Sequence, residues 1–364
     1  MINSNIFNTE KQDYEKTPLF FGERSGLFDT INKQYPDIWE IYKTIKSLDW
    51  DENEFNYSTC VNDFKTCDKS TYDMMIKTLA WQWEADSIVS RISPIVGCVV
   101  SSSELWAAWQ RLSDQEVIHT ATYSEIVRNS FEDPSDILNE ILNVRQSLNR
   151  LETVSRVMNN AYETAHKYAL GQIEVTQEVY NDIFMFVIAM LCLERIQFMS
   201  SFAITFAICD TGLFQPIGKA IQKIAQDEYE THVALDKAVF KHEMKTERGK
   251  IAYEQCKETI KNMIEEVIGS ESEWADYLFS EGRELIGVNV DIIKEWSKFC
   301  ARDVVMTTGV KCKYKLPTTN PLKFMENWLN IGKNQSSPQE EDNAQYKVNI
   351  MRRDDDGVEF DIDF

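Results

Sequence analysis

Residues 183–208 read IFMFVIAMLCLERIQFMSSFAITFAI, an apolar stretch long enough to cross a lipid bilayer. Glu194, Arg195 and Gln197 interrupt its middle, however, and a charged residue at the bilayer centre costs about 3 kcal/mol. We therefore interpret the segment as a helix buried inside a bundle, with a membrane span as the less favoured alternative. A charge inside such a helix must be paired or must bind a ligand, so Glu194 is a candidate functional residue.

The rest of the chain has the composition of an all-α protein. Only 13 glycines and 8 prolines occur in 364 residues, so few turns are expected between long helices. No linker rich in Gly, Ser or Pro interrupts the middle of the chain, and we predict a single helical domain over residues 1–332. Apolar residues recur at helical spacing in the segments at about 71–100, 103–130, 136–169, 177–210, 216–242, 247–268 and 272–307.

The composition changes after residue 332. Residues 333–364 contain nine acidic and four basic side chains and show no helical periodicity, so we predict a disordered, flexible acidic tail. Its last residues, 358–364, alternate apolar with acidic side chains (VEFDIDF). This pattern fits a short docking peptide or, equally, a fraying terminus.

The charge and the cysteines restrict the choice of partners. With 38 Lys and Arg against 59 Asp and Glu, the formal charge of −21 repels nucleic-acid phosphates and anionic lipids. We expect neither a nucleic acid nor a membrane as partner. The eight cysteines include no CxxC pair, and residues 1–11 lack the pattern of a secretory signal. Reduced thiols and a cytoplasmic location are therefore expected.

Two pairs of residues have the spacing of metal ligands. Glu116 and His119 are three residues apart, so on a helix their side chains lie within about 60° of each other. Glu228 and His232 are four residues apart, which gives an offset of about 40°. One such pair often arises by chance on a solvated helix face. Two pairs in a chain with only four histidines are a stronger signal.

Helical bundles that hold two iron or manganese ions add one carboxylate from each of two further helices. Glu194 is one candidate, and Asp86 is the other, with Glu84 as a neighbouring alternative that periodicity hardly disfavours. Four carboxylates and two imidazoles offset the charge of two divalent ions, and hard oxygen ligands suit iron or manganese. The sequence therefore predicts a dimetal site.

A tyrosine lies beside this predicted site. Tyr123 follows His119 by four residues, so it lies on the same helix face one turn further on. A phenol close to an oxygen-activating metal pair can be oxidised to a radical where its pocket is dry. The candidates for lining that pocket, each also an ordinary core residue by pattern alone, are Phe198, Phe202 and Ile224.

Together these motifs resemble a known family. The chain is similar to the small, radical-generating subunit of class I ribonucleotide reductases over nearly its whole length, from PLFFG at 18–22 to the tail. The stretches that carry the resemblance are DQEVIHTATYSEIVRN (114–129), LERIQFMSSF (193–202), QDEYETH (226–232), EWADYLF (273–279), NPLKFMENWL (320–329) and PQE (338–340). The resemblance implies a ferritin-like helical bundle, a homodimer, and a cofactor of two iron ions for which manganese is the alternative.

The resemblance also implies which residues bind the metal ions. The family's ligands correspond to Asp86, Glu116, His119, Glu194, Glu228 and His232. Asp86 rather than Glu84 matches, because the Asp-Ser-Ile stretch is the one that resembles the family. A stable radical is implied on Tyr123, in a pocket that includes Phe198, Phe202 and Ile224.

In the family, the oxidising equivalent passes to a cysteine of a separate large subunit, where ribonucleotides are reduced to deoxyribonucleotides. The implied route runs from Tyr123 past His119 and Asp227 to Trp50, and then through Tyr346 in the tail. Asp227 suits this role, because a carboxylate can accept a hydrogen bond from a metal-bound imidazole. The resemblance further implies that the end of the tail docks on the large subunit.

The chain departs from the family in one place. The usual second pair is Glu-x-x-His, whereas one more residue separates Glu228 from His232 here. The extra residue rotates the helix register by about 100° unless a π-bulge absorbs it. We therefore predict a π-bulge near residues 229–231.

Two other functions fit part of the pattern. A diiron oxidase or hydroxylase of the same bundle class shares the ligands but needs no redox-active tyrosine. Tyr123, Trp50 and Tyr346 argue against it. A non-catalytic helical scaffold with an acidic interaction tail is the third interpretation, and it predicts no bound metal.

Overall fold

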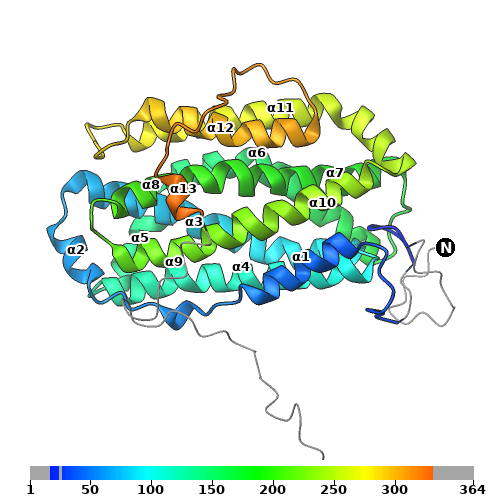
Figure 1. The fold of residues 1–364 in the computed structure, drawn as a ribbon, viewed down its shortest axis with the longest axis horizontal. Coiled ribbons are helices and arrows are strands. Elements are labelled where there is room, and N and C mark those ends of the chain that lie inside the picture. The colour runs from blue at the N-terminus through cyan, green and yellow to red at the C-terminus, as the bar shows by residue number, and fades with distance from the viewer. Residues whose placement is uncertain (1–16, 24–26, 331–364) are drawn as a thin grey trace, which may run out of the picture.

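The computed structural model describes residues 17–23 and 27–330, which form a bundle of long helices lying side by side (Figure 1). No β-strand occurs within these ranges, where the extended pairings are two isolated bridges, Phe20–Val100 and Leu285–Val288. The predicted all-α class is confirmed. The tail predicted at 333–364, with Tyr346 in it, lies outside the described residues.

The helices follow one another with mostly short connections. The α-helices are α1 (Pro36–Ser47), α2 (Cys60–Thr66), α3 (Lys69–Val96), α4 (Ser103–Ser130), α5 (Pro134–Leu142), α6 (Arg145–Ala169), α7 (Gln177–Cys192), α8 (Met199–Cys209), α9 (Gln215–Gln226), α10 (Val233–Glu243), α11 (Glu247–Leu278), α12 (Val290–Thr308) and α13 (Met325–Trp328). Two π-helices, η4 (Leu193–Phe198) and η5 (Asp227–His232), join α7 to α8 and α9 to α10. Short 3₁₀ turns are η2 (Glu52–Glu54) and η3 (Gly97–Val99).

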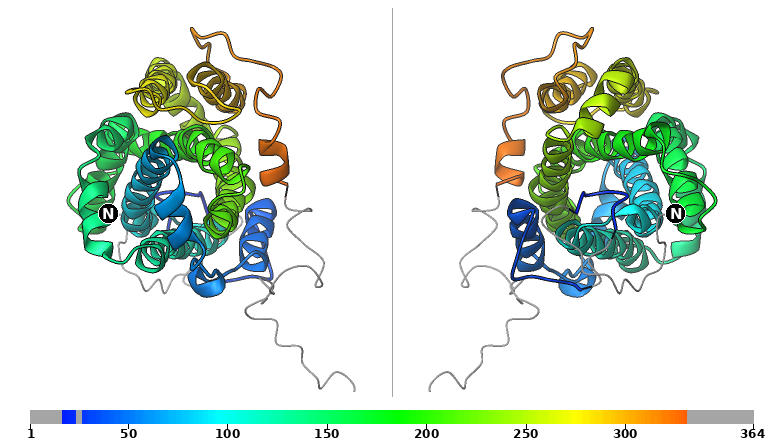
Figure 2. Two further views of the ribbon diagram at one scale, coloured as in Figure 1. Left: turned by 90° about the vertical axis from the view of Figure 1, so that its left-hand side faces the viewer. Right: turned by 90° about the vertical axis from the view of Figure 1, so that its right-hand side faces the viewer.

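Helix α3 lies inside the bundle. It packs against α4, α6 and α8, and Figure 2, which views the molecule from its two ends, shows a ring of helices around it with α11 and α12 outside the ring. Helices α11 and α12 form a pair on one side of the bundle, where α11 packs on α6 and α7 (Figure 1). The two π-helices contact each other, so the segments that carry the predicted ligands meet in the interior.

The apolar stretch forms part of one continuous helical run. Helix α7, η4 and α8 together span Gln177–Cys209, which is long and apolar enough to cross a membrane. Every residue of its most apolar window is buried inside the bundle. The run is therefore a core helix, which supports the interpretation made from its central charged residues.

Two predicted helix boundaries are wrong. The segment predicted over 136–169 is divided into α5 and α6, which residues 143–144 separate. The sequence predicted separate helices over 247–268 and 272–307, but α11 continues without a break across this gap. Val267 and Trp274, about two helical turns apart, are both buried, so the apolar face stays in helical register through residues 269–271. The chain turns later, between α11 and α12, where Gly282 and Gly287 adopt φ angles of 75° and 77°. Glycine reaches this left-handed region without steric strain.

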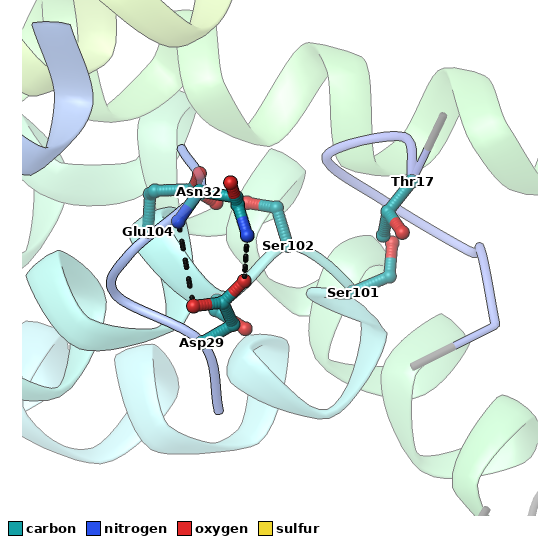
Figure 3. Close-up of a pocket in the computed structure, with 7 residues that line it drawn as sticks. Thr17, Asp29, Asn32, Ser101, Ser102 and Glu104 are labelled. Carbon is teal, nitrogen blue, oxygen red and sulfur yellow. Dashed lines mark hydrogen bonds between the residues drawn. The ribbon is translucent and has the colours of Figure 1, made fainter. Parts of the chain in front are cut away.

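The N-terminal segment is tied to the start of α4. Ser101 donates its hydroxyl to the carbonyl of Pro18 at 2.6 Å. Glu104 accepts the backbone N–H groups of Gln34 (2.7 Å) and Tyr35 (3.2 Å), immediately before α1. Figure 3 shows Ser101 and Glu104 at this corner of the molecule. These bonds hold the N-terminal segment and the start of α1 against the start of α4.

The buried position of the α7–α8 run predicts a large loss of stability when one of its side chains is truncated. Leu191 is 1% exposed, whereas Leu170, just after α6, is 68% exposed. Leu191→Ala should lower the free energy of unfolding by about 2–5 kcal/mol, because it leaves a cavity in the core. Leu170→Ala should change it by less than about 0.5 kcal/mol. Urea denaturation measures both, and equal effects would contradict the core position.

Candidate metal centre

The six predicted ligands meet at the centre of the bundle, and none has exposed surface. One donor atom from each residue lies within 4.8 Å of the others in each of two overlapping groups. The first group is Asp86, Glu116, His119 and Glu228, and the second is Glu116, Glu194, Glu228 and His232. These residues come from α3, α4, η4 and η5. Because Glu116 and Glu228 belong to both groups, their carboxylates are placed to bridge two ions.

Most donor atoms at this centre lack a hydrogen-bond partner. The atoms without one, among the described residues, are both carboxylate oxygens of Asp86, Glu116 and Glu194, Oε1 of Glu228 and Nδ1 of His119. Carboxylates buried away from water without partners are strongly unfavourable. Four carboxylates and two neutral imidazoles balance two divalent cations, and this mixture of donors suits iron or manganese. The residues therefore fit a dimetal centre.

Several groups at this centre have raised pKa values in the absence of metal. Burial, reinforced by the charge of Glu116, raises the pKa of Asp86 well above its usual value. Burial and the charge of Glu228 raise the pKa of Glu194 in the same way. Burial alone would lower the pKa of His232, but the carboxylates of Glu228 and Glu116 raise it to about 10. These groups must lose their protons before they bind metal ions.

The extra residue between Glu228 and His232 is absorbed by the π-helix η5, so the predicted bulge is confirmed. His232 Nδ1 lies 2.7 Å from Glu228 Oε2 and 3.3 Å from Glu116 Oε1. The imidazole therefore faces the other ligands. Thr231 is also buried, and its hydroxyl donates to the carbonyl of Asp227 at 2.8 Å within the widened turn.

A second π-helix, η4, carries Glu194 and was not predicted. Polar side chains of η4 fasten it to neighbouring helices. Arg195 Nε donates to Asp303 of α12 at 3.0 Å, and Gln197 Nε2 donates to the carbonyl of Arg150 of α6 at 2.8 Å. The sequence signal that could have indicated this π-helix is the interruption of an apolar run by Glu, Arg and Gln. Each of these buried polar groups needs a hydrogen-bond partner, so the local helix geometry must allow one.

The outer nitrogen of each imidazole has a hydrogen-bond partner. His119 Nε2 lies 3.1 Å from Oδ2 of Asp227, and the same oxygen accepts the indole N–H of Trp50 at 2.7 Å. The rings of Trp50 and His119 stack with their centroids 6.0 Å apart. His232 Nε2 lies 3.1 Å from Oε1 of Gln115, a partner that the sequence analysis missed. Such contacts fix the imidazole tautomer and leave Nδ1 to bind metal.

Tyr123 lies in a dry pocket beside the first group. Its side chain is 1% exposed, and burial together with the charge of Asp86 raises the pKa of the phenol well above its usual value. The Trp83 ring stacks near it, with 6.5 Å between the ring centroids, and the sequence analysis missed this neighbour. The predicted pocket residues are all fully buried core residues, and they are Phe198, Phe202 and Ile224. Their role beside Tyr123 stays a prediction.

Glu84, the alternative to Asp86, lies outside the cluster. Its half-buried carboxylate accepts a hydrogen bond from the hydroxyl of Ser147 on α6. Of the two carboxylates on this turn of α3, Asp86 is the one that joins the cluster.

A family model described as "Ribonucleotide reductase, small chain" matches residues 27–321. The chain belongs to this family. It is 26% identical to the ribonucleoside-diphosphate reductase subunit beta of Buchnera aphidicola subsp. Schizaphis graminum, over 97% of each chain. It is 27% identical to the ribonucleoside-diphosphate reductase 1 subunit beta of Salmonella typhimurium, over 94% of each chain. The resemblance found in the sequence is confirmed.

Two solved structures share the fold of this reductase small chain. The ribonucleotide reductase R2 subunit from Clostridium botulinum has a TM-score of 0.78 at 19% identity, covering 90% of this chain and 98% of that one. A dimanganese(II)-NrdF from Streptococcus sanguinis has a TM-score of 0.64 at 13% identity, covering 83% and 98%. The expected bundle fold is confirmed. The family uses a dimetal centre, and the buried cluster is consistent with one in this chain.

Metal uptake by this centre should release protons. The raised pKa values of Asp86, Glu194 and His232 favour the protonated forms in the metal-free protein, and these groups bind metal only after losing their protons. The apparent affinity for Mn²⁺ should therefore fall as the pH is lowered. Calorimetric titration in two buffers of different ionisation enthalpy counts the released protons. Glu230 is an exposed residue on the same π-helix, so Glu230→Ala should leave the number of released protons unchanged. Metal uptake without proton release would contradict the assignment of these groups as metal ligands.

Proposed function

We propose that this protein is the small subunit of a ribonucleoside-diphosphate reductase. It generates a radical on Tyr123 and passes the oxidising equivalent to a large subunit, which reduces ribonucleotides to deoxyribonucleotides. One observation carries the proposal: a buried cluster of four carboxylates and two imidazoles lies beside a dry tyrosine and is joined by hydrogen bonds to a tryptophan. The family of the chain favours this function over a diiron oxidase or hydroxylase.

We infer that the centre holds two iron ions, with manganese as the alternative. Each group of four residues would hold one ion, and Glu116 and Glu228, which belong to both groups, would be shared between the two. When bound, the ions would react with oxygen and supply the oxidising power for a one-electron oxidation of tyrosine. The hard oxygen and imidazole donors suit both metals.

The surroundings of Tyr123 prepare it for a stable radical. Its oxidation removes one electron and the phenolic proton, and Asp86 is the carboxylate beside the hydroxyl that can accept this proton. The raised pKa keeps the phenol protonated until it is oxidised. Because the side chain is 1% exposed, water and external reductants are kept away from the ring.

Electron transfer to and from the centre follows a hydrogen-bonded path in this proposal. The indole N–H of Trp50 and Nε2 of His119 share one oxygen of Asp227, so three buried side chains join the cluster to the loop after α1. We propose that the path continues through Tyr346 in the tail, beyond the described residues. The resemblance to the family supports this last step.

The remaining partners are proposed from the sequence and the family. The small chain of this family pairs with a large chain. We propose that residues 358–364 dock on it, since their alternating apolar and acidic side chains suit a groove with basic edges. A homodimer is proposed from the family resemblance. A cytoplasmic location is supported by the eight cysteines, all of which have free thiols.

Tyr123→Phe should retain both metal ions and form no tyrosyl radical, because the change removes the oxidisable hydroxyl and leaves all six ligands in place. The measurement is low-temperature electron paramagnetic resonance with a metal count, on apoprotein reconstituted with ferrous iron and oxygen. The expected count is about two irons per chain.

Tyr162→Phe is the matched control. Tyr162 lies on α6 and is 43% exposed, so this substitution should leave the radical unchanged. A radical that persists in Tyr123→Phe would show that the radical forms on a residue other than Tyr123. Two irons without any radical in the wild type would favour an oxidase, and no bound metal would leave a scaffold.

Deletion of residues 358–364 should weaken binding of the large subunit and leave the metal content unchanged, because the deletion removes the proposed docking peptide.

Tyr346→Phe should bind the large subunit normally, retain the Tyr123 radical and lose nucleotide reduction. Affinity is measured by surface plasmon resonance, and turnover by deoxyribonucleotide formation. Unchanged affinity after the deletion would refute docking by these residues, and equal turnover of Tyr346→Phe would remove it from the path.

A further inference from the structure

Two buried tryptophans lie close to the metal centre. Trp50 stacks on the ligand His119 and is 4% exposed. Trp81 is 0% exposed and lies on α3, five residues before the ligand Asp86, from which it is about 7.5 Å along the helix axis and about 140° around it. Its ring also contacts Phe198 of η4, with 5.0 Å between the ring centroids. By position alone, either indole is placed to give an electron to the centre.

The two indoles have opposite electrostatic surroundings. The N–H of Trp50 donates to the carboxylate of Asp227 at 2.7 Å. The face of Trp81 is covered by the guanidinium of Arg150, whose central carbon lies 3.7 Å from the ring centroid. The N–H of Trp81 has no hydrogen-bond partner among the described residues. The same guanidinium lies 5.1 Å from the ring of Trp274.

The Arg150 guanidinium is fixed in this position by buried partners on other helices. Nε and Nη2 bind the two carboxylate oxygens of Glu271 on α11 at 2.6 and 2.7 Å. Nη2 also donates to the carbonyl of Gln197 in η4, and Nη1 donates to the hydroxyl of Ser201 in α8. The positive end of the ion pair is therefore held against the Trp81 ring. Apolar residues can often replace a buried ion pair without loss of stability, so the pair by itself is weak evidence for a purely stabilising role.

This geometry makes Trp81 harder to oxidise than Trp50. Loss of one electron leaves an indole radical cation, which needs either a nearby negative charge or an acceptor for its Nε1 proton. Trp50 has both in the carboxylate of Asp227. Trp81 has a positive charge against its ring and no acceptor for its proton, and like charges repel strongly in a buried site.

We propose that Arg150 keeps Trp81 from giving an electron to the metal centre, so that the electron is supplied through Trp50. The proposal rests on the proposed function. There two ferrous ions and Tyr123 supply three of the four electrons that reduce oxygen, and one indole supplies the fourth. An electron taken from Trp81 would leave an oxidised ring beside Phe198, away from the path to the large subunit. Arg150 is thus a positioning residue that directs the electron transfer.

The test in metal-free protein uses a photo-excited ruthenium tris-bipyridine complex with persulfate as the one-electron oxidant. Peptide mass spectrometry then locates the oxidised tryptophans. In the wild type we expect oxidation at Trp50 and background levels at Trp81. The double variant R150M/E271L removes both charges of the pair, so neither is left buried alone. In this variant, oxidation of Trp81 should rise to a yield comparable with that of Trp50.

A matched control is available on the same two helices. Arg156 of α6 and Glu266 of α11 form an exposed ion pair at 2.7 Å, so R156M/E266L should leave the oxidation pattern unchanged. Trp81 at background in R150M/E271L would overturn the proposal. So would oxidation of Trp81 in the wild type at the yield of Trp50, a result that does not depend on the folding of the double variant.

A second measurement uses the iron-loaded protein. R150M/E271L should form less Tyr123 radical than the wild type by electron paramagnetic resonance, because Trp81 now competes as a source of electrons. Adding Trp81→Phe to this variant should restore the yield, whereas Trp81→Phe alone should not change it. Failure of Trp81→Phe to restore the radical would overturn the proposal. The oxidation pattern of the tryptophans in metal-free protein does not depend on a Tyr123 radical. It therefore tests this proposal even if the proposed function is wrong.

Discussion

The structure depends on one constraint: four carboxylates lie in the dry centre of a helical bundle, at 0% exposure and mostly without hydrogen bonds. Such a cluster is unfavourable until two divalent cations, or protons in their place, balance its charge. The apolar helices around it must therefore hold the carboxylates together against their repulsion. This explains why the run Gln177–Cys209 is as hydrophobic as a membrane helix although it lies wholly inside the protein.

The two π-helices carry ligands and help to bring them together: η4 carries Glu194, and η5 carries Glu228 and His232. A π-turn exposes backbone carbonyls that a regular helix would satisfy, and the structure supplies polar partners for them. In η5 the hydroxyl of Thr231 bonds to the carbonyl of Asp227, and in η4 the guanidinium of Arg150 bonds to the carbonyl of Gln197. The extra residue after Glu228 is thus accommodated without moving His232 away from the other ligands.

The sequence predicted the parts of this arrangement that depend on local spacing. Helical periodicity indicated the all-α class. The bulge that η5 contains was indicated by the departure of Glu228 and His232 from the Glu-x-x-His spacing of the family that the chain resembles. The boundary expected near residue 270 was wrong, because burial of Trp274 by other helices continues α11 through a polar stretch.

The spacing of residues along the chain could not predict contacts between distant segments. Glu271 binds Arg150 across 121 residues of sequence, and Gln115 meets His232 across 117. Neither pair forms a motif, because an amide or a guanidinium is recognised as a partner only once the helices are packed. The choice of Asp86 over Glu84 has the same origin, since Ser147 of another helix engages Glu84.

The two sides of the centre differ in a way that follows from these contacts. On the side of Asp86 and His119, the neighbouring groups are redox-active, with Tyr123 beside Asp86 and Trp50 stacked on His119. On the side of Glu194 and His232, the neighbours anchor the ligands, through Arg195 to Asp303 and through the neutral amide of Gln115. A carboxylate behind His119 makes its imidazole the more electron-rich of the two. The fold therefore places the oxidisable side chains and the contacts that anchor ligands on opposite sides of one buried cluster.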